Sequence, residues 1–281
     1  MAKFDSVTVV SVAGEGDGRN AVYAIKTSMD HLPGSKGLLI AAERPDNLGD
    51  SIQFESIGYL DYYQYALYAI QCLYYHIRTD YILKVEQDGW VLDGNNWSDD
   101  WFNYDYIGAP CPIGAHDGKL LHNFAWVGLD GSIPVQCGGF SWRSRALLEA
   151  PTKYGICYKI SNIRYMLHED VQLCVSLRGD LEKRGLRIAP LATALDFCIE
   201  YMHPVLHREV DLHRIFGHHG RTRKIREGSV VETGITQAQM DRIFGENRIV
   251  ALLEEYGYVV RREWPSNGTA TKEQGSRTSI R

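Results

Sequence analysis

Residues 81–89 read YILKVEQDG, a short apolar run that ends in two acidic residues and a glycine. The run from Tyr81 to Val85 predicts a buried strand, and Gly89 permits a sharp turn directly after it. Glu86 and Asp88 are two positions apart, so both carboxylates can converge on one hard cation and on the diphosphate oxygens that such a cation binds. A solvated acidic turn is the alternative interpretation of the same motif.

Strand and helix patterns alternate on the N-terminal side of this motif. Residues 6–13 (SVTVVSVA) and 37–42 (GLLIAA) predict buried strands, and residues 20–31 and 61–78 predict helices. This alternation predicts an α/β fold with a mostly parallel central sheet and helices on both faces. Ligands of such sheets bind at the carboxyl ends of the strands, which is where Glu86 and Asp88 fall.

The C-terminal side carries further elements. Residues 104–107 and 138–142 predict strands, and the polar residues 112–123 between them predict a loop over an active site. Helices are expected over 168–177 and 236–256, the latter broken near Gly245, and residues 213–220 are expected to be irregular. We therefore predict a catalytic unit over 1–230, a helical appendage over 231–263 and a flexible tail over 264–281.

Composition excludes several classes of protein. The 281 residues are 44% hydrophobic and 23% charged, which is ordinary for a globular chain. A net charge of −5 gives no global attraction to nucleic acid or to anionic membranes. No apolar run approaches the roughly 20 residues of a membrane span, and Met1 to Asp5 lack the features of a signal peptide, so a cytoplasmic location is expected.

The six cysteines occur singly and never as C-x-x-C. We therefore expect reduced thiols, and neither disulfides nor zinc ligation by these residues.

Two further motifs have both structural and chemical interpretations. Gly138 and Gly139 let the backbone approach a ligand closely, or else form a tight bend between a strand and a helix. Glu169 and Asp170 either stabilise the first turn of a helix or supply carboxylates for catalysis.

Five blocks in order, YILKVEQDG, DYIGAP, CGGFSWRSR, HEDVQLC and FGHHG, resemble a glycosyltransferase-like family of unknown function (DUF5672-type) that is similar to the GT-A superfamily. The resemblance covers residues 81–220. Glu86 stands where the family has Gln, which brings the motif closer to the D-x-D metal motif of GT-A enzymes. Cys137 stands where the family has Asn, which removes an amide contact.

The resemblance implies a metal-dependent enzyme that moves a sugar from a nucleoside diphosphate sugar to an acceptor hydroxyl. Uridine is the commonest base among similar enzymes. The implied metal is Mn²⁺ or Mg²⁺, held by Glu86, Asp88 and His219, with His218 as the second choice. Asp170 is the implied general base of an inverting transfer, and Glu169 would bind acceptor hydroxyls.

Donor contacts are expected from several places in the chain. The resemblance implies that Gly138 and Gly139 form the wall that faces the donor sugar or acceptor. Arg221 begins a basic run with Arg223, Lys224 and Arg226 that can clamp phosphates or face solvent. The nucleotide is expected over the first strand, at Val10, Ser11, Val12 and Ala13.

Two other classes of function remain open from the sequence. A metal-dependent phosphoesterase can use the same Asp, Glu and His side chains. A non-catalytic module that binds a nucleotide sugar or a nucleic acid can use the basic run. The acceptor itself is left open among a glycan, a small molecule and a modified base in DNA.

Overall fold

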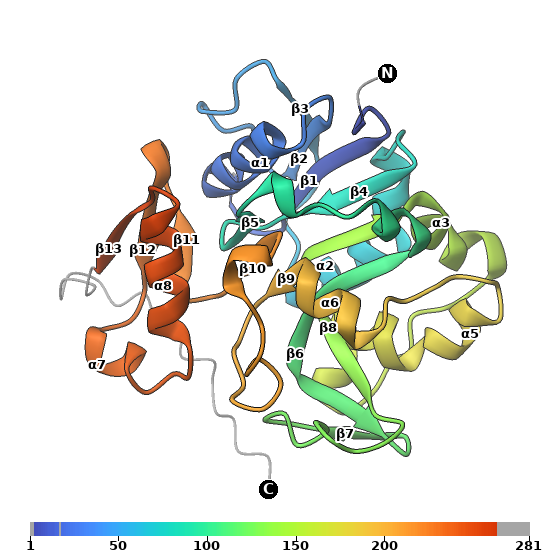
Figure 1. Ribbon diagram of the computed structural model, residues 1–281. Coiled ribbons are helices and arrows are strands. Elements are labelled where there is room, and N and C mark those ends of the chain that lie inside the picture. Colours follow the sequence, from blue (N-terminus) through green and yellow to red (C-terminus); the bar gives the residue numbers. More distant parts are fainter. Residues whose placement is uncertain (1–2, 17, 263–281) are drawn as a thin grey trace, which may run out of the picture.

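A seven-stranded sheet runs through the centre of the protein (Figure 1) in the order β3-β2-β1-β4-β8-β6-β7. The computed structural model describes residues 3–16 and 18–262. The strands of this sheet are β1 (Val7–Ala13), β2 (Lys36–Ala41), β3 (Ile52–Ser56), β4 (Tyr81–Lys84), β6 (Tyr106–His116), β7 (Lys119–Leu121) and β8 (Ile133–Ser144).

The half of the sheet built from β3, β2, β1 and β4 is parallel. Its strands are short apolar runs, because strands covered on both faces have no side exposed to water. Strand β8 then pairs with β4 and β6 in the antiparallel sense, so that β6 points the same way as β4. The prediction of an α/β fold with a mostly parallel sheet is confirmed.

Helices cover both faces of the parallel half. Val7 and Val9 of β1 pack in the core that includes Val22 and Ile25 of α1 (Arg19–His31). Val10 and Val12 of β1 point to the opposite face, where a second core holds side chains of α2 (Tyr62–Gln71) and α3 (Arg145–Tyr154). The period of two residues along β1 therefore divides its side chains between two cores.

Side-chain caps fix where α2 and α3 begin. Asp61 accepts hydrogen bonds from the backbone N–H groups of Tyr63 and Gln64 at 2.9 and 2.8 Å, and the Gln64 side chain bonds back to the Asp61 N–H. Helix α3 begins at Arg145. Its first turn is capped by Ser144, whose hydroxyl accepts from Leu147 N.

Residues 112–123 are not a loop over the site, contrary to the prediction. Strand β6 continues through them to His116 and pairs with β7, and Gly114 faces Leu121 across this hairpin. Gly114 also lies against the Trp126 ring, so the polar residues are exposed positions of a strand pair. The prediction failed because glycine and proline in an edge hairpin look like loop composition.

A second, three-stranded sheet joins distant parts of the chain. Strand β10 (Gly217–His219) pairs antiparallel with β5 (Gly89–Val91) and parallel with β9 (Cys198–Ile199), which follows α6 (Leu191–Phe197). His219 is opposite Gly89 in this register. Residues 217–219 are thus a strand, where irregular structure was predicted, and the pairing brings them beside the acidic turn.

The segment that carries Glu169 and Asp170 is helical, as predicted, but not uniformly. A first turn, α4 (Glu169–Val171), passes into one turn of π-helix over Gln172–Ser176 and then into α5 (Arg178–Glu182). The π turn marks a local irregularity next to a carboxylate pair, which is a common setting for functional residues.

The C-terminal residues form a separate layer beside β10 (Figure 1). Strands β11 (Arg223–Ile225), β12 (Val230–Thr233) and β13 (Val259–Arg262) make a small sheet against α8 (Glu246–Glu255), and α7 (Gln237–Met240) precedes α8. The predicted break near Gly245 is confirmed, since Gly245 adopts φ 79° between the two helices. The appendage predicted over 231–263 contains strands as well as helices, and the tail predicted over 264–281 lies outside the described residues.

All six cysteines are free thiols, as predicted. Within residues 3–16 and 18–262, no helix combines the length and the apolar character needed to cross a membrane.

Candidate active site

The acidic turn after β4 lies at the carboxyl edge of the parallel strands. The backbone N–H of Val85 donates to Val10 O at 2.9 Å, which fixes the turn beside the end of β1. The chain then reverses, since Gly89 N donates to Glu86 O at 3.0 Å before β5 begins. Because β5 leads away at once, Glu86 and Asp88 are left side by side at this edge.

His219 meets both carboxylates of the turn. Its Nε2 atom lies 3.3 Å from Oδ1 of Asp88 and 3.9 Å from Oε2 of Glu86. One ligand atom from each of these three residues lies within 4.8 Å of the other two. The structure therefore brings together the three residues that the resemblance implied as metal ligands.

The chemistry of this group fits a divalent cation. Oδ1 of Asp88 and Nε2 of His219 are buried and have no hydrogen-bond partner. Buried polar atoms are nearly always paired, and these two lie 3.3 Å from each other, so either a shared proton or a cation bound by both can satisfy them. Two carboxylate oxygens and an imidazole nitrogen are a donor set that suits Mn²⁺.

Glycines make room for this arrangement. A Cβ atom on Gly139 would lie 2.2 Å from Nε2 of His219, and a Cβ atom on Gly89 would lie 2.9 Å from the same ring. Any side chain at position 139 would therefore collide with the His219 ring, which explains the second glycine of the pair at 138–139.

Lys84 holds Glu86 in place from below the turn. Its fully buried ammonium group donates to Oε1 of Glu86 at 2.7 Å and to Gly138 O at 2.9 Å. Tyr65 donates its hydroxyl to the same Oε1 at 2.6 Å. Burial by itself raises the pKa of Glu86, but the charge of Lys84 and then of His219 outweighs it and lowers the pKa to about 2. Glu86 is thus ionised, with Oε2 left free to face His219.

Glu169 is held in a buried ion pair. Its Oε1 atom accepts from Arg143 at 2.7 Å and lies 3.4 Å from the Lys84 ammonium. Arg143 is fully buried and also donates to Gly138 O. A Cβ atom on Gly138 would lie 2.2 Å from Oε1 of Glu169, so the absence of a side chain there admits the carboxylate. The second oxygen of Glu169, Oε2, is buried without a hydrogen-bond partner.

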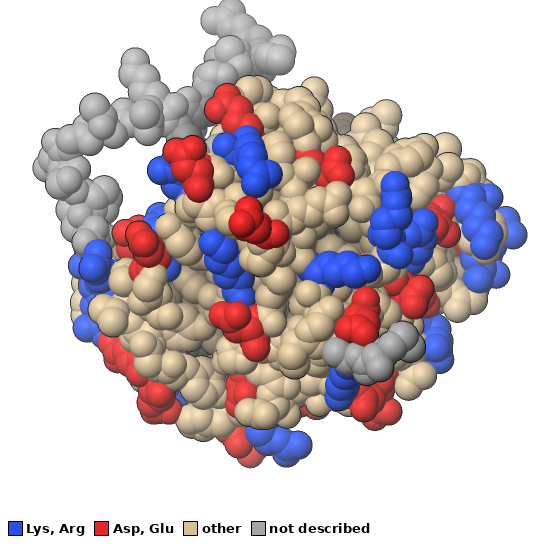
Figure 2. All heavy atoms as spheres, turned by 90° about the horizontal axis from the view of Figure 1, so that it is seen from above, with Lys and Arg blue, Asp and Glu red and all other residues tan. Residues whose placement is uncertain are grey.

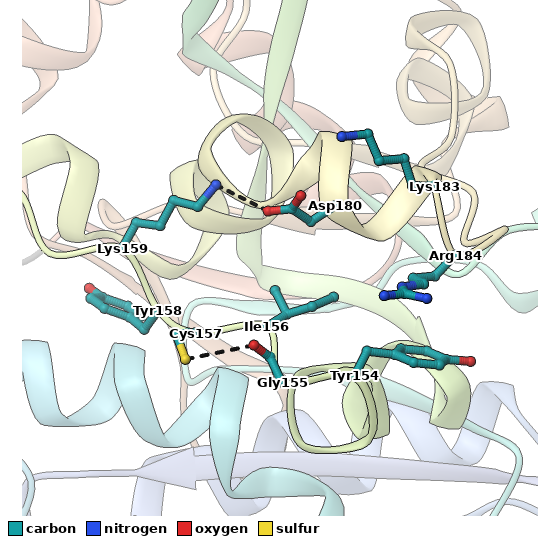
Figure 3. Close-up of a pocket in the computed structure, with 9 residues that line it drawn as sticks. All are labelled: Tyr154, Gly155, Ile156, Cys157, Tyr158, Lys159, Asp180, Lys183 and Arg184. Carbon is teal, nitrogen blue, oxygen red and sulfur yellow. Dashed lines mark hydrogen bonds and ion pairs between the residues drawn. The ribbon is translucent and has the colours of Figure 1, made fainter.

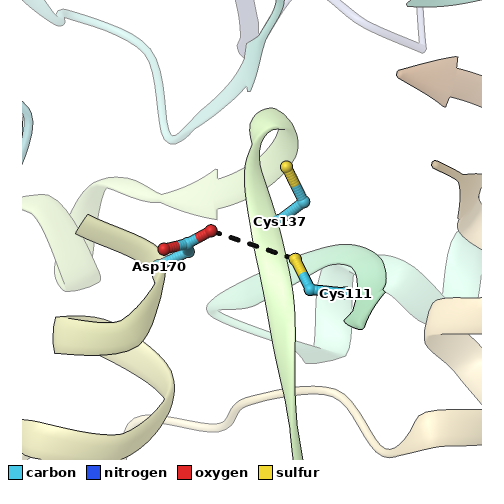
Figure 4. Close-up of side chains that lie close together, drawn as sticks. All are labelled: Cys111, Cys137 and Asp170. Carbon is cyan, nitrogen blue, oxygen red and sulfur yellow. Dashed lines mark hydrogen bonds between the residues drawn. The ribbon is translucent and has the colours of Figure 1, made fainter. Parts of the chain in front are cut away.

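Asp170 has the environment of a proton acceptor. Burial, with the charges of Glu169 and Glu200, raises its pKa to about 7. Its Oδ1 accepts from Val171 N at 2.8 Å, and Oδ2 lies 3.9 Å from the Cys111 thiol (Figure 4). Asp170 lies within 4.8 Å of the thiols of Cys111 and Cys137, and Cys137 in turn lies next to His219. Cys137 therefore lies close both to Asp170 and to the imidazole at the acidic turn.

His218 points away from this group. Alternation along β10 directs it into the core, where its ring lies 4.0 Å from that of Trp90. Burial and the nearby charge of Arg223 lower its pKa well below the ordinary value, so the ring is neutral. Of the two histidines that the sequence left open, the structure places His219 at the acidic turn.

The basic run does not form a continuous surface. Arg223 is 1% exposed and forms an ion pair with Glu246, and Arg226 pairs with Glu232 at 2.7 Å. Arg221 is exposed at the rim, and Tyr201, Tyr62 and Glu200 raise its pKa against the effect of burial. On the face shown in Figure 2, basic and acidic side chains are interspersed. A nucleic acid would find no stripe of cations along this run.

Strand β1 offers a nucleotide little side-chain contact. Val10, Ser11 and Val12 are 0%, 1% and 5% exposed because β1 is central and covered on both faces. A nucleotide would have to contact Ala13 and the glycine-rich loop after it, where the Gly14 carbonyl accepts from Leu60 N at 2.8 Å. Of the four residues of β1 that were expected to contact the nucleotide, Ala13 is the one whose side chain is not buried.

Several site residues gave no clear signal in the sequence: Tyr62, Tyr65, Lys84, Arg143, Glu200 and Tyr201. Tyr65 bonds Glu86, and Tyr62 is 45% exposed and close enough to Asp170, Glu169 and Arg221 for their charges to act on its pKa. A lysine inside an apolar strand, as Lys84 is, requires an acidic partner when buried, and this is the signal that could have identified it.

A hollow on another part of the surface has a volume of about 660 Å³ (Figure 3). It is lined by residues 154–159 and by Asp180, Lys183 and Arg184. None of the residues of the acidic turn or of β10 lines it, so it is separate from the candidate site.

Known proteins resemble the chain in sequence and in structure. Residues 55–219 match the family described as protein of unknown function, DUF5672. The galactosyltransferase LgtC in complex with donor and acceptor sugar analogues is 11% identical, over 88% of this chain and 95% of that chain, with a TM-score of 0.45. An active-site mutant of LgtC is 12% identical over the same shares, with a TM-score of 0.42. No curated protein matches the chain significantly.

The match to the family covers more than half of the 281 residues and includes the acidic turn, Gly138 and Gly139, the Glu169–Asp170 pair and His219. The resemblance drawn from the five sequence blocks is confirmed. The chain belongs to the DUF5672 family.

Proposed function

We propose that this chain is a metal-dependent glycosyltransferase of the GT-A kind that uses a nucleoside diphosphate sugar, most simply a uridine one, as donor. The observation that carries the proposal is the pair of buried, unpartnered atoms, Oδ1 of Asp88 and Nε2 of His219, facing each other beside Glu86. They lie at the carboxyl edge of a parallel sheet, which is where such folds bind nucleotides.

Glu86, Asp88 and His219 would hold Mn²⁺ or Mg²⁺. When bound, the ion would neutralise the negative charge on the diphosphate leaving group. Lys84 keeps Glu86 ionised and fixes its Oε1, so that Oε2 faces the cation position. Tyr65 adds a second fixed donor to the same oxygen, which limits rotation of the carboxylate.

Asp170 is the general base of this proposal. Its pKa of about 7 lets it hold a proton part of the time at neutral pH and accept one from an acceptor hydroxyl. An inverting transfer would need this base on the side of the sugar opposite the diphosphate. Glu169 cannot move freely toward an acceptor, because Arg143 and Lys84 hold its Oε1; only the unpartnered Oε2 remains for a substrate hydroxyl.

Arg221 and Tyr62 are the rim residues of the proposal. Arg221 is the one member of the basic run that is exposed beside the acidic site, and it would face the donor phosphates. Tyr62 is exposed and stacks edge-on against His168 at 5.0 Å, which leaves an aromatic face for a sugar ring or a base.

The test is a panel of nucleoside diphosphate sugars assayed by thermal shift with and without Mn²⁺, followed by product analysis. We expect at least one donor to raise the melting temperature only when Mn²⁺ is present. Release of nucleoside diphosphate with transfer of the sugar supports the proposal. Release of phosphate from an ester without any sugar acceptor would instead identify a phosphoesterase that uses the same three ligands.

A further inference from the structure

His219 belongs to two groups of potential ligands, one on each side of its ring. The Nε2 side faces Asp88 and Glu86, as described above. On the other side, Nδ1 lies 3.3 Å from the thiol of Cys137 and 3.4 Å from Oε1 of Glu200. The ligand atoms of Cys137, Glu200 and His219 all lie within 4.8 Å of one another, and all three residues are buried.

A second thiol extends this group. The Cys111 sulfur lies 3.5 Å from Oε2 of Glu200 and within 4.8 Å of the Cys137 sulfur, beside Asp170 (Figure 4). Cys137, Glu200 and His219, from β8, the residue after β9 and β10, thus form one group, and Cys111 of β6 adjoins it through Cys137 and Oε2 of Glu200. These positions are far apart in the sequence, which is why singly spaced cysteines predicted no zinc ligation.

The spacing of these atoms suits a tetrahedral ion. Zinc binds sulfur at about 2.3 Å and nitrogen or oxygen at about 2.0–2.2 Å, so tetrahedral ligand atoms lie about 3.4–3.8 Å apart. Two distances within the group of Cys137, Glu200 and His219, 3.3 and 3.4 Å, are close to this range, and the Cys111 sulfur lies 3.5 Å from the other oxygen of Glu200. Thiolate ligands select thiophilic cations such as Zn²⁺, whereas the oxygen-rich side of the ring suits Mn²⁺.

Glu200 gives an independent reason to expect a cation. Its carboxylate is 6% exposed, and a buried charge is stable only when it is paired or coordinates a metal. His219 is the basic side chain within ion-pair distance of it, and the same imidazole also lies against Asp88 and Glu86. Lys84 pairs with Glu86, so His219 carries a single charge for the two carboxylates of Asp88 and Glu200.

We propose that Cys111, Cys137, Glu200 and Nδ1 of His219 form a site for a thiophilic divalent cation such as Zn²⁺, and that occupation of this site excludes His219 from the site at Glu86 and Asp88. The thiols bind as thiolates and release their protons to solvent. The site depends on Cys137, the position at which this chain departs from the Asn of its family, so it is a property of this sequence and not of the resemblance.

The exclusion follows from the single proton of a neutral imidazole. When Nε2 binds a cation at the acidic turn, Nδ1 keeps the proton and can donate it to Glu200, which orients the ring. When Nδ1 binds a cation at the thiols, Nε2 keeps the proton and can donate it to Asp88. Each cation thus requires the tautomer that the other one removes. The proposal goes beyond sugar transfer, and only the exclusion uses the metal site of the proposed function.

The thiol site is tested with Co²⁺ as the spectroscopic substitute for Zn²⁺ in the full-length, metal-free protein. We expect wild type to give an intense sulfur-to-cobalt charge-transfer absorption in the near ultraviolet that Zn²⁺ abolishes. Cys137→Ser lowers the intensity of this band, and Cys111→Ser combined with Cys137→Ser abolishes it, because each thiolate contributes to the absorption. Asp88→Asn retains the band, and Cys157→Ser, which changes an exposed thiol outside the site, also retains it. A wild-type protein without the band, or a band of full intensity in Cys137→Ser, overturns the site.

The exclusion is tested by Mn²⁺ binding, followed by electron paramagnetic resonance. One equivalent of Zn²⁺ lowers the Mn²⁺ affinity of wild type at least tenfold more than that of Cys137→Ser, in which Zn²⁺ competes only directly at the acidic turn. Simultaneous binding of both ions to wild type overturns the exclusion. If wild type binds no Mn²⁺ at all, the metal site of the proposed function and the exclusion are both refuted. The cobalt spectrum then still tests the thiol site.

A weakened or lost band could also follow from misfolding. Circular dichroism and thermal unfolding of Cys137→Ser check this, and Cys111→Ser and Glu200→Gln provide second variants. We expect Glu200→Gln to weaken Co²⁺ binding while the charge-transfer band survives at saturating metal, because both sulfurs remain. A band of unchanged affinity in Glu200→Gln removes Glu200 from the ligand set and contradicts the proposed site.

Discussion

Nε2 of His219 lies 3.3 Å from Oδ1 of Asp88, and both atoms are buried without a hydrogen bond. The two residues come from β10 and from the turn before β5, strands that pair directly. The position of the imidazole is therefore set by backbone hydrogen bonds between β5 and β10, so it does not depend on flexible side chains.

Replacing Asp88 by Asn should abolish tight Mn²⁺ binding. An amide keeps the shape of the side chain but removes the charge, and we expect a loss larger than the roughly 10–100-fold that follows removal of an outer-shell partner. Isothermal titration with Mn²⁺ measures the effect. Asp130→Asn, at an exposed position away from the site, is the matched control. Equal Mn²⁺ affinity in wild type and Asp88→Asn would rule out the assignment of this residue.

Activity should rise with pH through about 7, because Asp170 must be ionised to accept a proton and its pKa is raised to about 7. Below that value the rate should fall about tenfold per pH unit. Asp170→Asn should lower transfer by roughly 10²–10⁴-fold while Mn²⁺ binding is kept. A pH–rate profile of the two proteins checks this; a variant with wild-type turnover would remove Asp170 from catalysis.

The same group should make stability depend on pH. The pKa of Asp170 is raised in the folded protein relative to the unfolded chain, so between about pH 4 and 7 the folded state binds more protons. The free energy of unfolding from this group is therefore greatest below pH 4 and is lost as the pH rises through 7, by a few kcal/mol at most. Urea denaturation at pH 5 and pH 8 measures it. The difference between these pH values should shrink in Asp170→Asn, and an unchanged difference would argue against the raised pKa.

Gly139→Ala should weaken metal binding by displacing the imidazole. The added methyl group would lie 2.2 Å from Nε2 of His219, a contact that only movement of the ring can relieve. Gly179→Ala is the control, because a Cβ atom there meets nothing within 4 Å and the residue lies in helix α5, where alanine is favoured over glycine. Titration with Mn²⁺ and thermal unfolding of both variants separate the two effects. Intact Mn²⁺ affinity in Gly139→Ala would contradict the placement of the ring.

Glu169→Gln should destabilise the fold. Arg143 and Lys84 are fully buried, and removal of the carboxylate charge leaves both cations with Glu86 as their remaining acidic neighbour. Breaking a buried ion pair in this way costs about 3–5 kcal/mol. Chemical denaturation measures the loss, with Glu182→Gln, in an exposed pair with Arg178, as a control expected to cost about 1 kcal/mol or less. Equal effects of the two changes would show that the buried pair contributes no more than a surface pair.

The parallel half of the sheet was predictable because its strands are short apolar runs separated by helical periodicity. The residues 112–123 were not, since the glycines and proline of an edge hairpin share their composition with loops. The same limit applies to the site. Glu86, Asp88 and His219 stood out as motif residues. The burial of Arg143, Arg223 and Lys84, however, depends on partners distant in the sequence, namely Glu169, Glu246 and the Gly138 carbonyl.

The pairing of β5 with β10 also sets the order in which the site can come into existence. During synthesis the acidic turn leaves the ribosome long before Glu200 and His219, so a nascent chain carries carboxylates without the imidazole that completes them. Chains that stop before residue 219 can contain every strand of the large sheet and still lack the cation position. On the proposed function, the chain therefore acquires the ability to bind metal only after β10 has been synthesised.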